Sequence, residues 1–184
     1  MHTTLPRHFY ADPESYRAEL ERFYFKRWIC AGRADQIPNP GDYFVRVIGD
    51  DSIIVTRDIS GEIRALFNVC RHRGTAVDEE SCGRAVRFQC PYHAWIYDLD
   101  GSLIRAKHTD DLDDFTFAEY GLAPIRVETW QGFVFVSLDP EATPLVEWLG
   151  DLGPQSARFD FSSLRCAHKE TYEVRAERTV TAEN

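Results

Sequence analysis

The sequence predicts a mainly β fold, an antiparallel β-sandwich or small barrel with an N-terminal helix and short peripheral helices. From Asp42 onward, apolar residues alternate with polar ones in short runs, and glycine- or aspartate-rich turns separate these runs. The chain of 184 residues is 43% hydrophobic and 28% charged, a composition typical of a globular protein. Its length allows one large domain, or one domain with an extension.

The first predicted element is a helix near the N-terminus. Asp12 is a suitable N-cap and Pro13 suits the first helical position. Apolar residues then recur at helical spacing, so one face of this helix is expected to carry Tyr16, Leu20, Phe23, Tyr24 and Trp28.

Short strands are predicted after this helix. The alternating runs cover residues 43–48, 52–56, 63–67, 84–88, 96–99, 103–104, 124–128 and 132–138. The dipeptide Asp100-Gly101 is the strongest hairpin signal among the turns. A second short helix is expected to follow, with Thr143 as its cap, Pro144 at its start and Gly153 at its end.

Charge and composition exclude several classes of function. With 30 acidic and 21 basic residues the net charge is −9, which argues against nucleic-acid binding. Charged residues interrupt the N-terminal segment, and no run approaches the ~20 apolar residues of a membrane span, so we expect a cytoplasmic protein without membrane contact. Five cysteines, an odd number, indicate reduced thiols or metal ligands rather than a disulfide framework.

Two Cys/His pairs form the main candidate site. Cys70 and His72 lie in one predicted turn, and Cys90 and His93 lie in another. Two thiolates and two imidazoles fit a tetrahedral zinc ion, or a [2Fe-2S] cluster in which cysteines hold one iron and histidines the other. The ligand types alone leave both metals open. The other cysteines are expected to be ordinary thiols.

The residues around these pairs resemble the iron-sulfur motif of the Rieske non-haem iron oxygenases. The stretches 70–74, Cys-Arg-His-Arg-Gly, and 90–95, Cys-Pro-Tyr-His-Ala-Trp, follow that motif, except that Ala94 stands where the family has glycine. Similar stretches occur at residues 5–13, 41–43, 64–69 and 98–101. The chain is thus identified as a member of this family, resembling the N-terminal Rieske domain of an α subunit, and its opening favours the glycine betaine branch.

The resemblance implies a cofactor, partners and residue roles. It implies a [2Fe-2S] cluster bound by Cys70, His72, Cys90 and His93, with electrons arriving from a reductase or ferredoxin. His93 is implied to be the electron exit, reaching an aspartate of the neighbouring subunit in a trimer. High-potential Rieske proteins carry a serine hydroxyl where this chain has Trp95, so we expect a potential at the low end of about −150 to +300 mV.

Oxygen activation in this family needs a second iron, Fe(II), on two histidines and a carboxylate. The remaining histidines form no such set, and Tyr172–Asn184 resembles the opening of the family's catalytic domain. We therefore expect a helical extension at 1–40, a Rieske domain at 41–140 and, at 141–184, a helix and the start of the connection to an absent catalytic domain. Such a chain is expected not to be catalytic alone. The alternatives are a free-standing Rieske ferredoxin and a structural zinc module.

Overall fold

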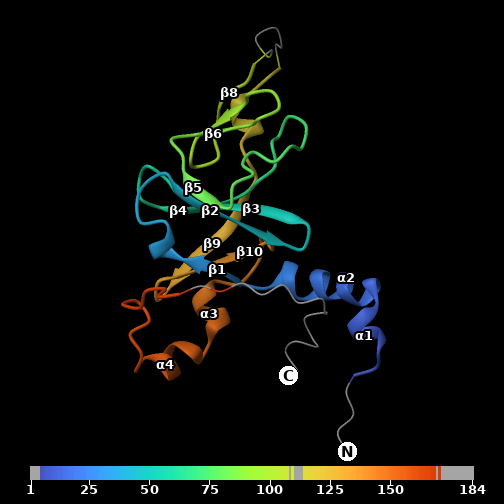
Figure 1. The fold of residues 1–184 in the computed structure, drawn as a ribbon, viewed down its shortest axis with the longest axis vertical. Coiled ribbons are helices and arrows are strands. Elements are labelled where there is room, and N and C mark those ends of the chain that lie inside the picture. The colour runs from blue at the N-terminus through green and yellow to red at the C-terminus, as the bar shows by residue number, and fades with distance from the viewer. Residues whose placement is uncertain (1–4, 108, 110–113, 169, 171–184) are drawn as a thin grey trace, which may run out of the picture.

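Two antiparallel sheets form the framework of the protein, as Figure 1 shows for the computed structural model. The structure describes residues 5–107, 109, 114–168 and 170. The prediction of a mainly β, antiparallel fold with few short helices is confirmed. Residues 171–184, which contain the predicted opening of a catalytic domain, lie outside the described residues.

The larger sheet has seven strands in the order β1-β10-β9-β4-β3-β2-β5, and the smaller has three in the order β6-β7-β8. All of the pairings are antiparallel. The strands are β1 (Ile29–Arg33), β2 (Asp42–Ile48), β3 (Asp51–Arg57), β4 (Ile63–Phe67), β5 (Cys82–Arg84), β6 (Phe88–Gln89), β7 (Ile96–Tyr97), β8 (Leu103–Arg105), β9 (Pro124–Trp130) and β10 (Phe133–Ser137).

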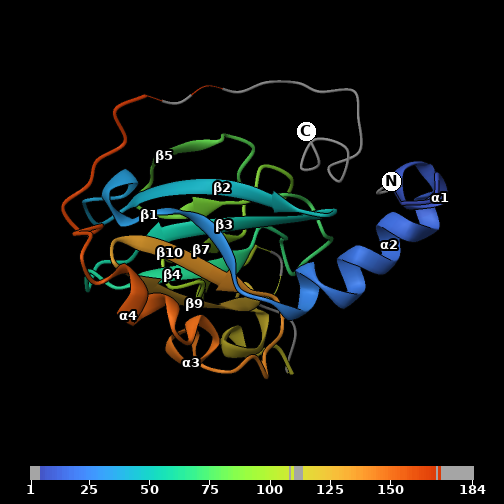
Figure 2. The ribbon, with the colours of Figure 1, turned by 90° about the horizontal axis from the view of Figure 1, so that it is seen from below.

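Short helices lie at the ends of the sheets. They are α1 (His8–Ala11), α2 (Pro13–Arg22), α3 (Leu145–Leu149) and α4 (Leu152–Ser156), with single 3-10 turns at η1 (Tyr24–Lys26), η2 (Ala34–Gln36) and η3 (Phe117–Tyr120). Figure 2 shows that α1 and α2 extend away from the sheets, whereas α3 and α4 lie beneath β9 and β10. Among the described residues, no helix is long and apolar enough to cross a membrane.

The N-terminal helix begins as predicted and ends earlier than predicted. The Asp12 carboxylate accepts a hydrogen bond from the Glu14 N–H, and Pro13 occupies the first turn. The helix ends at Arg22, and Trp28 lies outside it. Trp28 packs beside α3, where its indole N–H donates to the Thr143 carbonyl at 2.8 Å. The predicted apolar face is not a core face, since no α2 residue is buried in this structure.

The run 84–88, predicted as one strand, is divided between the two sheets. Arg84 pairs with Asp42 in the large sheet, whereas Phe88 pairs with Tyr97 in the small one. Between them Val86 is 85% exposed, while the Phe88 side chain is 1% exposed in the core. The prediction of a single strand was wrong because these residues must turn from one sheet to the other.

The hairpin predicted at Asp100-Gly101 joins β7 to β8. Gly101 has φ +93°, its N–H donates to Asp98, and the Asp98 N–H donates to the Ser102 carbonyl. A Cβ at Gly101 would lie 2.7 Å from the Leu66 side chain of β4. Glycine at this turn therefore lets the hairpin tip pack directly on the large sheet.

The second predicted helix is also shorter than expected. Thr143 makes no side-chain cap, and Gly150, with φ +50°, ends α3. Gly153 does not terminate the segment, because it lies inside α4. Leu145 and Leu149 are buried against Trp28, and the Glu128 carboxylate of β9 accepts a hydrogen bond from the Leu145 N–H at 3.0 Å, so contacts with other elements hold α3 in place.

Two larger clusters of buried side chains form the core. One lies within the large sheet around Ile53, Val55, Val134 and Val136. The other lies where the small sheet packs on the large one, and it includes both Cys70 and Cys90. The five cysteines, all of them described, form no disulfide.

The turn between β3 and β4 depends on one buried carboxylate. Asp58 accepts from the Ser60 hydroxyl and the Glu62 N–H through one oxygen, and from the Arg64 guanidinium through the other at 2.7 Å. Burial raises the pKa of Asp58, but the hydrogen bonds from Ser60 and Arg64 outweigh it and leave the pKa below its ordinary value. The ionised form is thus the stabilising one.

We expect Asp58→Asn to lower the free energy of unfolding by about 2 kcal/mol at pH 7, because charged hydrogen bonds are lost. In the parent protein this contribution is complete above about pH 4 and disappears as the pH falls through the lowered pKa of the folded state. Urea unfolding between pH 2.5 and 7 measures both effects. Asp114→Asn, at an exposed position, is the control. An equal pH dependence in parent and Asp58→Asn would contradict this assignment.

Candidate metal centre

The first ligand loop is a tight turn between Cys70 and Thr75. The Cys70 N–H donates to the Thr75 carbonyl at 2.8 Å, and the Gly74 N–H donates to the Cys70 carbonyl at 2.9 Å. Gly74 has φ +74°, in the left-handed region. These bonds hold the loop closed and direct Cys70 inward, where it is 2% exposed, while His72 remains exposed.

The second loop repeats the same bonds. The Cys90 N–H donates to the Trp95 carbonyl at 2.8 Å, and the Ala94 N–H donates to the Cys90 carbonyl at 3.0 Å. Ala94 therefore occupies the position of Gly74, and it too is left-handed, with φ +55°. The two ligand pairs lie on equivalent turns, and the second carries a side chain where the backbone favours glycine.

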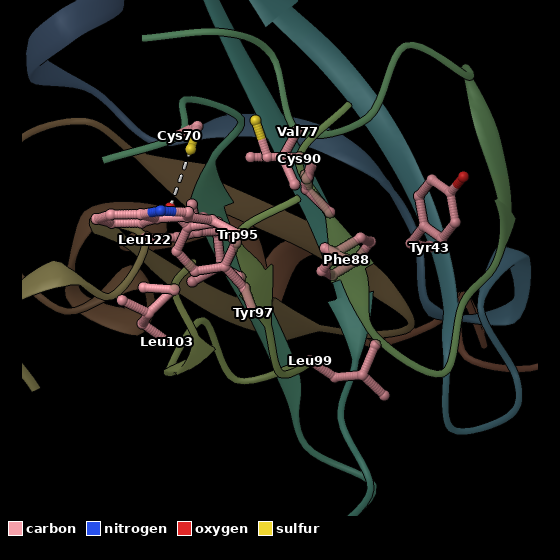
Figure 3. Close-up of a cluster of buried hydrophobic side chains, with 13 residues drawn as sticks. Tyr43, Cys70, Val77, Phe88, Cys90, Trp95, Tyr97, Leu99, Leu103 and Leu122 are labelled. Atoms are coloured by element: carbon pink, nitrogen blue, oxygen red, sulfur yellow. Dashed lines mark hydrogen bonds between the residues drawn. The ribbon is translucent and has the colours of Figure 1, made fainter. Parts of the chain in front are cut away.

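The two thiols meet in the buried half of the site. Cys70 and Cys90 are each 2% exposed and interact with each other. Burial raises the pKa of the Cys90 thiol, and the N–H groups of Tyr92 and His93 oppose this shift. Figure 3 shows both sulfurs in the same cluster of buried side chains, with a hydrogen bond between Cys70 Sγ and the Tyr97 hydroxyl.

The two imidazoles meet nearer the surface. The ring centroids of His72 and His93 are 4.6 Å apart, and His72 stacks on Trp95 at 4.9 Å. Partial desolvation and the neighbouring His93 lower the pKa of His72, which favours its neutral, metal-binding form. A hollow of about 420 Å³ opens beside the rings, and its lining includes Arg73, Lys107, Phe115 and Tyr120.

Two nitrogens in this arrangement are buried without a hydrogen-bond partner. His93 Nδ1 is shielded from solvent and makes no hydrogen bond, as is also true of Trp95 Nε1. Burying a polar atom of this kind lowers the stability of the folded protein unless another group hydrogen-bonds or coordinates the atom. With two buried thiols nearby, His93 Nδ1 fits a metal ligand, so the residues present fit an iron-sulfur group.

The two types of donor lie in different surroundings. The thiols of Cys70 and Cys90 are buried, whereas the imidazoles of His72 and His93 lie nearer the surface. A [2Fe-2S] cluster with cysteines on one iron and histidines on the other needs such a division, whereas tetrahedral zinc requires all four donors around one point. The division therefore favours the iron-sulfur group.

Tyr97 is a residue of this site that the sequence analysis missed. Its fully buried hydroxyl lies 3.1 Å from Cys70 Sγ and accepts from the Arg71 N–H at 3.1 Å. Burial and the contact with Cys70 raise the pKa of Tyr97, so the hydroxyl stays protonated. Since it already accepts from Arg71, its own hydrogen is available to a Cys70 thiolate. The sequence does contain one indication of this role. Tyr97 lies two residues after Trp95, in the strand that leaves the second loop, so its side chain could reach the site.

Comparisons with known proteins agree with these features. Residues 27–116 match the Rieske [2Fe-2S] domain family. The chain is 33% identical, over 98% of its length, to the glycine betaine monooxygenase oxygenase subunit of Pseudomonas aeruginosa. It is 37% identical, over 82% of its length, to the carnitine monooxygenase oxygenase subunit of Escherichia coli.

Solved structures show the same similarity. The apo form of the quaternary ammonium Rieske monooxygenase CntA matches 98% of this chain with a TM-score of 0.91 and 31% identity. Naphthalene 1,2-dioxygenase from Rhodococcus, bound to indole, matches 81% with a TM-score of 0.76 and 39% identity. The chain covers 42% and 40% of the two curated relatives, and 53% and 34% of these two structures.

The equivalence of the two turns gives a prediction. We expect Ala94→Gly to raise the free energy of unfolding by up to about 1 kcal/mol, because it relieves a left-handed alanine. Gly74→Ala should lower it by about 1 kcal/mol or more, even though a Cβ there would meet nothing within 4 Å. Denaturant midpoints of both variants check this, and unchanged stability in Gly74→Ala would refute it.

Proposed function

The chain belongs to the Rieske [2Fe-2S] domain family found in Rieske oxygenase α subunits, and we propose that it passes single electrons to a mononuclear non-haem iron on another domain or polypeptide. A Rieske domain binds a [2Fe-2S] cluster, which when bound accepts and donates one electron at a time. The observation that carries the proposal is the pairing of two buried thiols with two imidazoles near the surface, on two equivalent turns.

We propose that Cys70 and Cys90 hold one iron and that His72 and His93 hold the other. The unpartnered His93 Nδ1 supports this set. The exposed cysteines Cys30, Cys82 and Cys166 lie outside the set.

We propose His93 as the electron exit. Its ring is half-buried, lies between Tyr92 at 3.8 Å and His72 at 4.6 Å, and borders the hollow beside the site. When Nδ1 binds a metal, the other ring nitrogen is free to hydrogen-bond a carboxylate on a partner. A similar quaternary ammonium Rieske monooxygenase is described with inter-subunit electron transfer, which supports a multi-subunit assembly. We propose a trimer as that assembly and a reductase or ferredoxin as the electron donor.

Substrate class follows from the relatives only as a proposal. The similar oxygenase subunits act on glycine betaine and carnitine by name, and a similar chloroplast enzyme of Spinacia oleracea acts on choline. We propose that this chain serves an oxygenase for quaternary ammonium compounds of that kind.

We also propose the domain boundaries 1–40, 41–140 and 141–184. Within the first of these segments, β1 pairs with β10 of the large sheet.

The ligand assignment predicts the composition of the purified protein. We expect two iron and two inorganic sulfide per chain with visible absorption, and we expect Cys90→Ser and His93→Ala to lose both, because each removes one ligand. Cys82→Ser, which removes an exposed cysteine between the two loops, should keep both. A colourless protein containing zinc and no sulfide would overturn the assignment.

Electron transfer is tested by mixing. Adding the loaded protein and a reductase to a polypeptide that supplies the mononuclear iron domain should give NAD(P)H- and O2-dependent product from a quaternary ammonium substrate. Electron transfer to a soluble acceptor, with none to any iron-domain partner, would support a free-standing ferredoxin instead.

The Tyr97 hydroxyl predicts a change in redox potential. Donation to a Cys70 thiolate stabilises the more negative, reduced state, so Tyr97→Phe should lower the midpoint potential by some tens of millivolts, on the order of 1 kcal/mol. This effect opposes the low potential expected from Trp95. Redox titration of the loaded protein measures it, and Tyr120→Phe is the control, because Tyr120 packs against the same buried cluster as Tyr97. An equal potential in Tyr97→Phe and the parent would exclude this role.

A further inference from the structure

Equivalent backbone hydrogen bonds close the two turns, but the limbs below the turns are joined by different means. The loop of residues 90–95 lies between β6 and β7, whose backbones pair directly at Phe88 with Tyr97 and at Gln89 with Ile96. The loop that carries Cys70 follows β4, but the chain after it forms no strand until Cys82. Below the Cys70–Thr75 backbone hydrogen bond, its two limbs therefore have no strand pairing to fix the distance between them.

A side-chain amide occupies the place of that ladder. Asn68 lies directly after β4, two residues before Cys70. Its Oδ1 accepts from the N–H groups of Val77 and Asp78, both at 2.9 Å, on the returning limb. Its Nδ2 donates to the Asp78 carbonyl at 2.6 Å and to the Ser52 hydroxyl at 3.0 Å on β3.

All of the hydrogen-bonding positions of this amide are used. An asparagine side chain offers two donor hydrogens and an oxygen with two lone pairs, and the four contacts match them one for one. Asn68 is 2% exposed, so water does not compete for these contacts. Its own N–H donates to the Ser52 carbonyl at 2.9 Å, which holds the amide against β3. A satisfied buried network of this kind specifies one geometry.

The returning limb is itself anchored in the core. Val77 is 4% exposed in the same buried cluster as Cys70 and Cys90. The Asp78 carboxylate hydrogen-bonds Tyr43 of β2, and together with burial this contact raises the pKa of that tyrosine. Asn68 thus connects Ser52 on β3 with the limb that contains Val77 and Asp78, and both of these are held in place. The Cys70 loop spans the distance between them.

We propose that Asn68 is a positioning residue for Cys70 and His72, a role that rests on the proposed ligand set. Its amide holds the limbs of the loop 68–78 at one separation. That separation places the Cys70 sulfur at the Tyr97 hydroxyl and the His72 ring on Trp95. Without the amide, both ligands lose the position from which they face the ligands of the second loop.

The experiment compares the loaded parent protein with Asn68→Ala. We expect Asn68→Ala to release its iron to EDTA about 10- to 100-fold faster, the range usual for residues that support metal ligands. We also expect the chains that remain loaded to show altered EPR g-values and a shifted midpoint potential, because the Cys70 and His72 contacts change. A purely structural asparagine would lower stability without moving these two signals.

Two further variants complete the test. Asn39→Ala removes another asparagine side chain that bonds within the large sheet, at Asp42, and should leave all three measurements unchanged. Ser52→Ala removes only one of the four amide contacts and should shift the same signals by less, which keeps the test available should Asn68→Ala fail to fold.

The measurements distinguish failure of the positioning role from failure of the proposed function. Wild-type release rate, g-values and potential in both Asn68→Ala and Ser52→Ala would overturn the positioning role and leave the proposed function intact. A parent protein without iron and sulfide would overturn the proposed function, and this role with it.

Discussion

The packing of the β7–β8 hairpin on the large sheet is the contact on which the site depends. Cys70 follows β4 of the large sheet, and Cys90 follows β6 of the small sheet, so the thiols meet only if the sheets do. Gly101 lets the hairpin tip pack against Leu66, and Tyr97 lies in the buried cluster with the cysteines of both loops. The hydrophobic contact between the sheets therefore determines the geometry of the ligands as well as the stability of the fold.

The same packing divides the site into two environments. The thiols lie in the buried cluster, where the Tyr97 hydroxyl hydrogen-bonds Cys70. The imidazoles lie at the edge, with His72 exposed and His93 beside a hollow. If these residues hold the cluster as proposed, its cysteine-bound iron would lie in the interior beside a hydrogen-bond donor, and its histidine-bound iron would lie at the surface, where a partner could reach it.

The local predictions that succeeded concern residues whose role depends on near neighbours. Asp12 caps α2 through its own carboxylate, Asp100-Gly101 turns the hairpin, and the alternating runs became strands at nearly the expected positions. The predictions that failed needed distant contacts. Trp28 left the helix to pack beside α3, and the run 84–88 was split because its ends belong to different sheets.

By itself the sequence determined the donor types, their grouping into two pairs and the mainly β fold, since each depends on residue identity and short spacing. Tertiary structure alone decided which side chains support those donors. Tyr97 bonds a cysteine 27 positions away, and the Asn68 amide contacts residues on β3 and on the far limb of the first loop. A hydrogen bond forms only within about 3 Å, and proximity across such separations is set by the packing of whole sheets rather than by any local pattern.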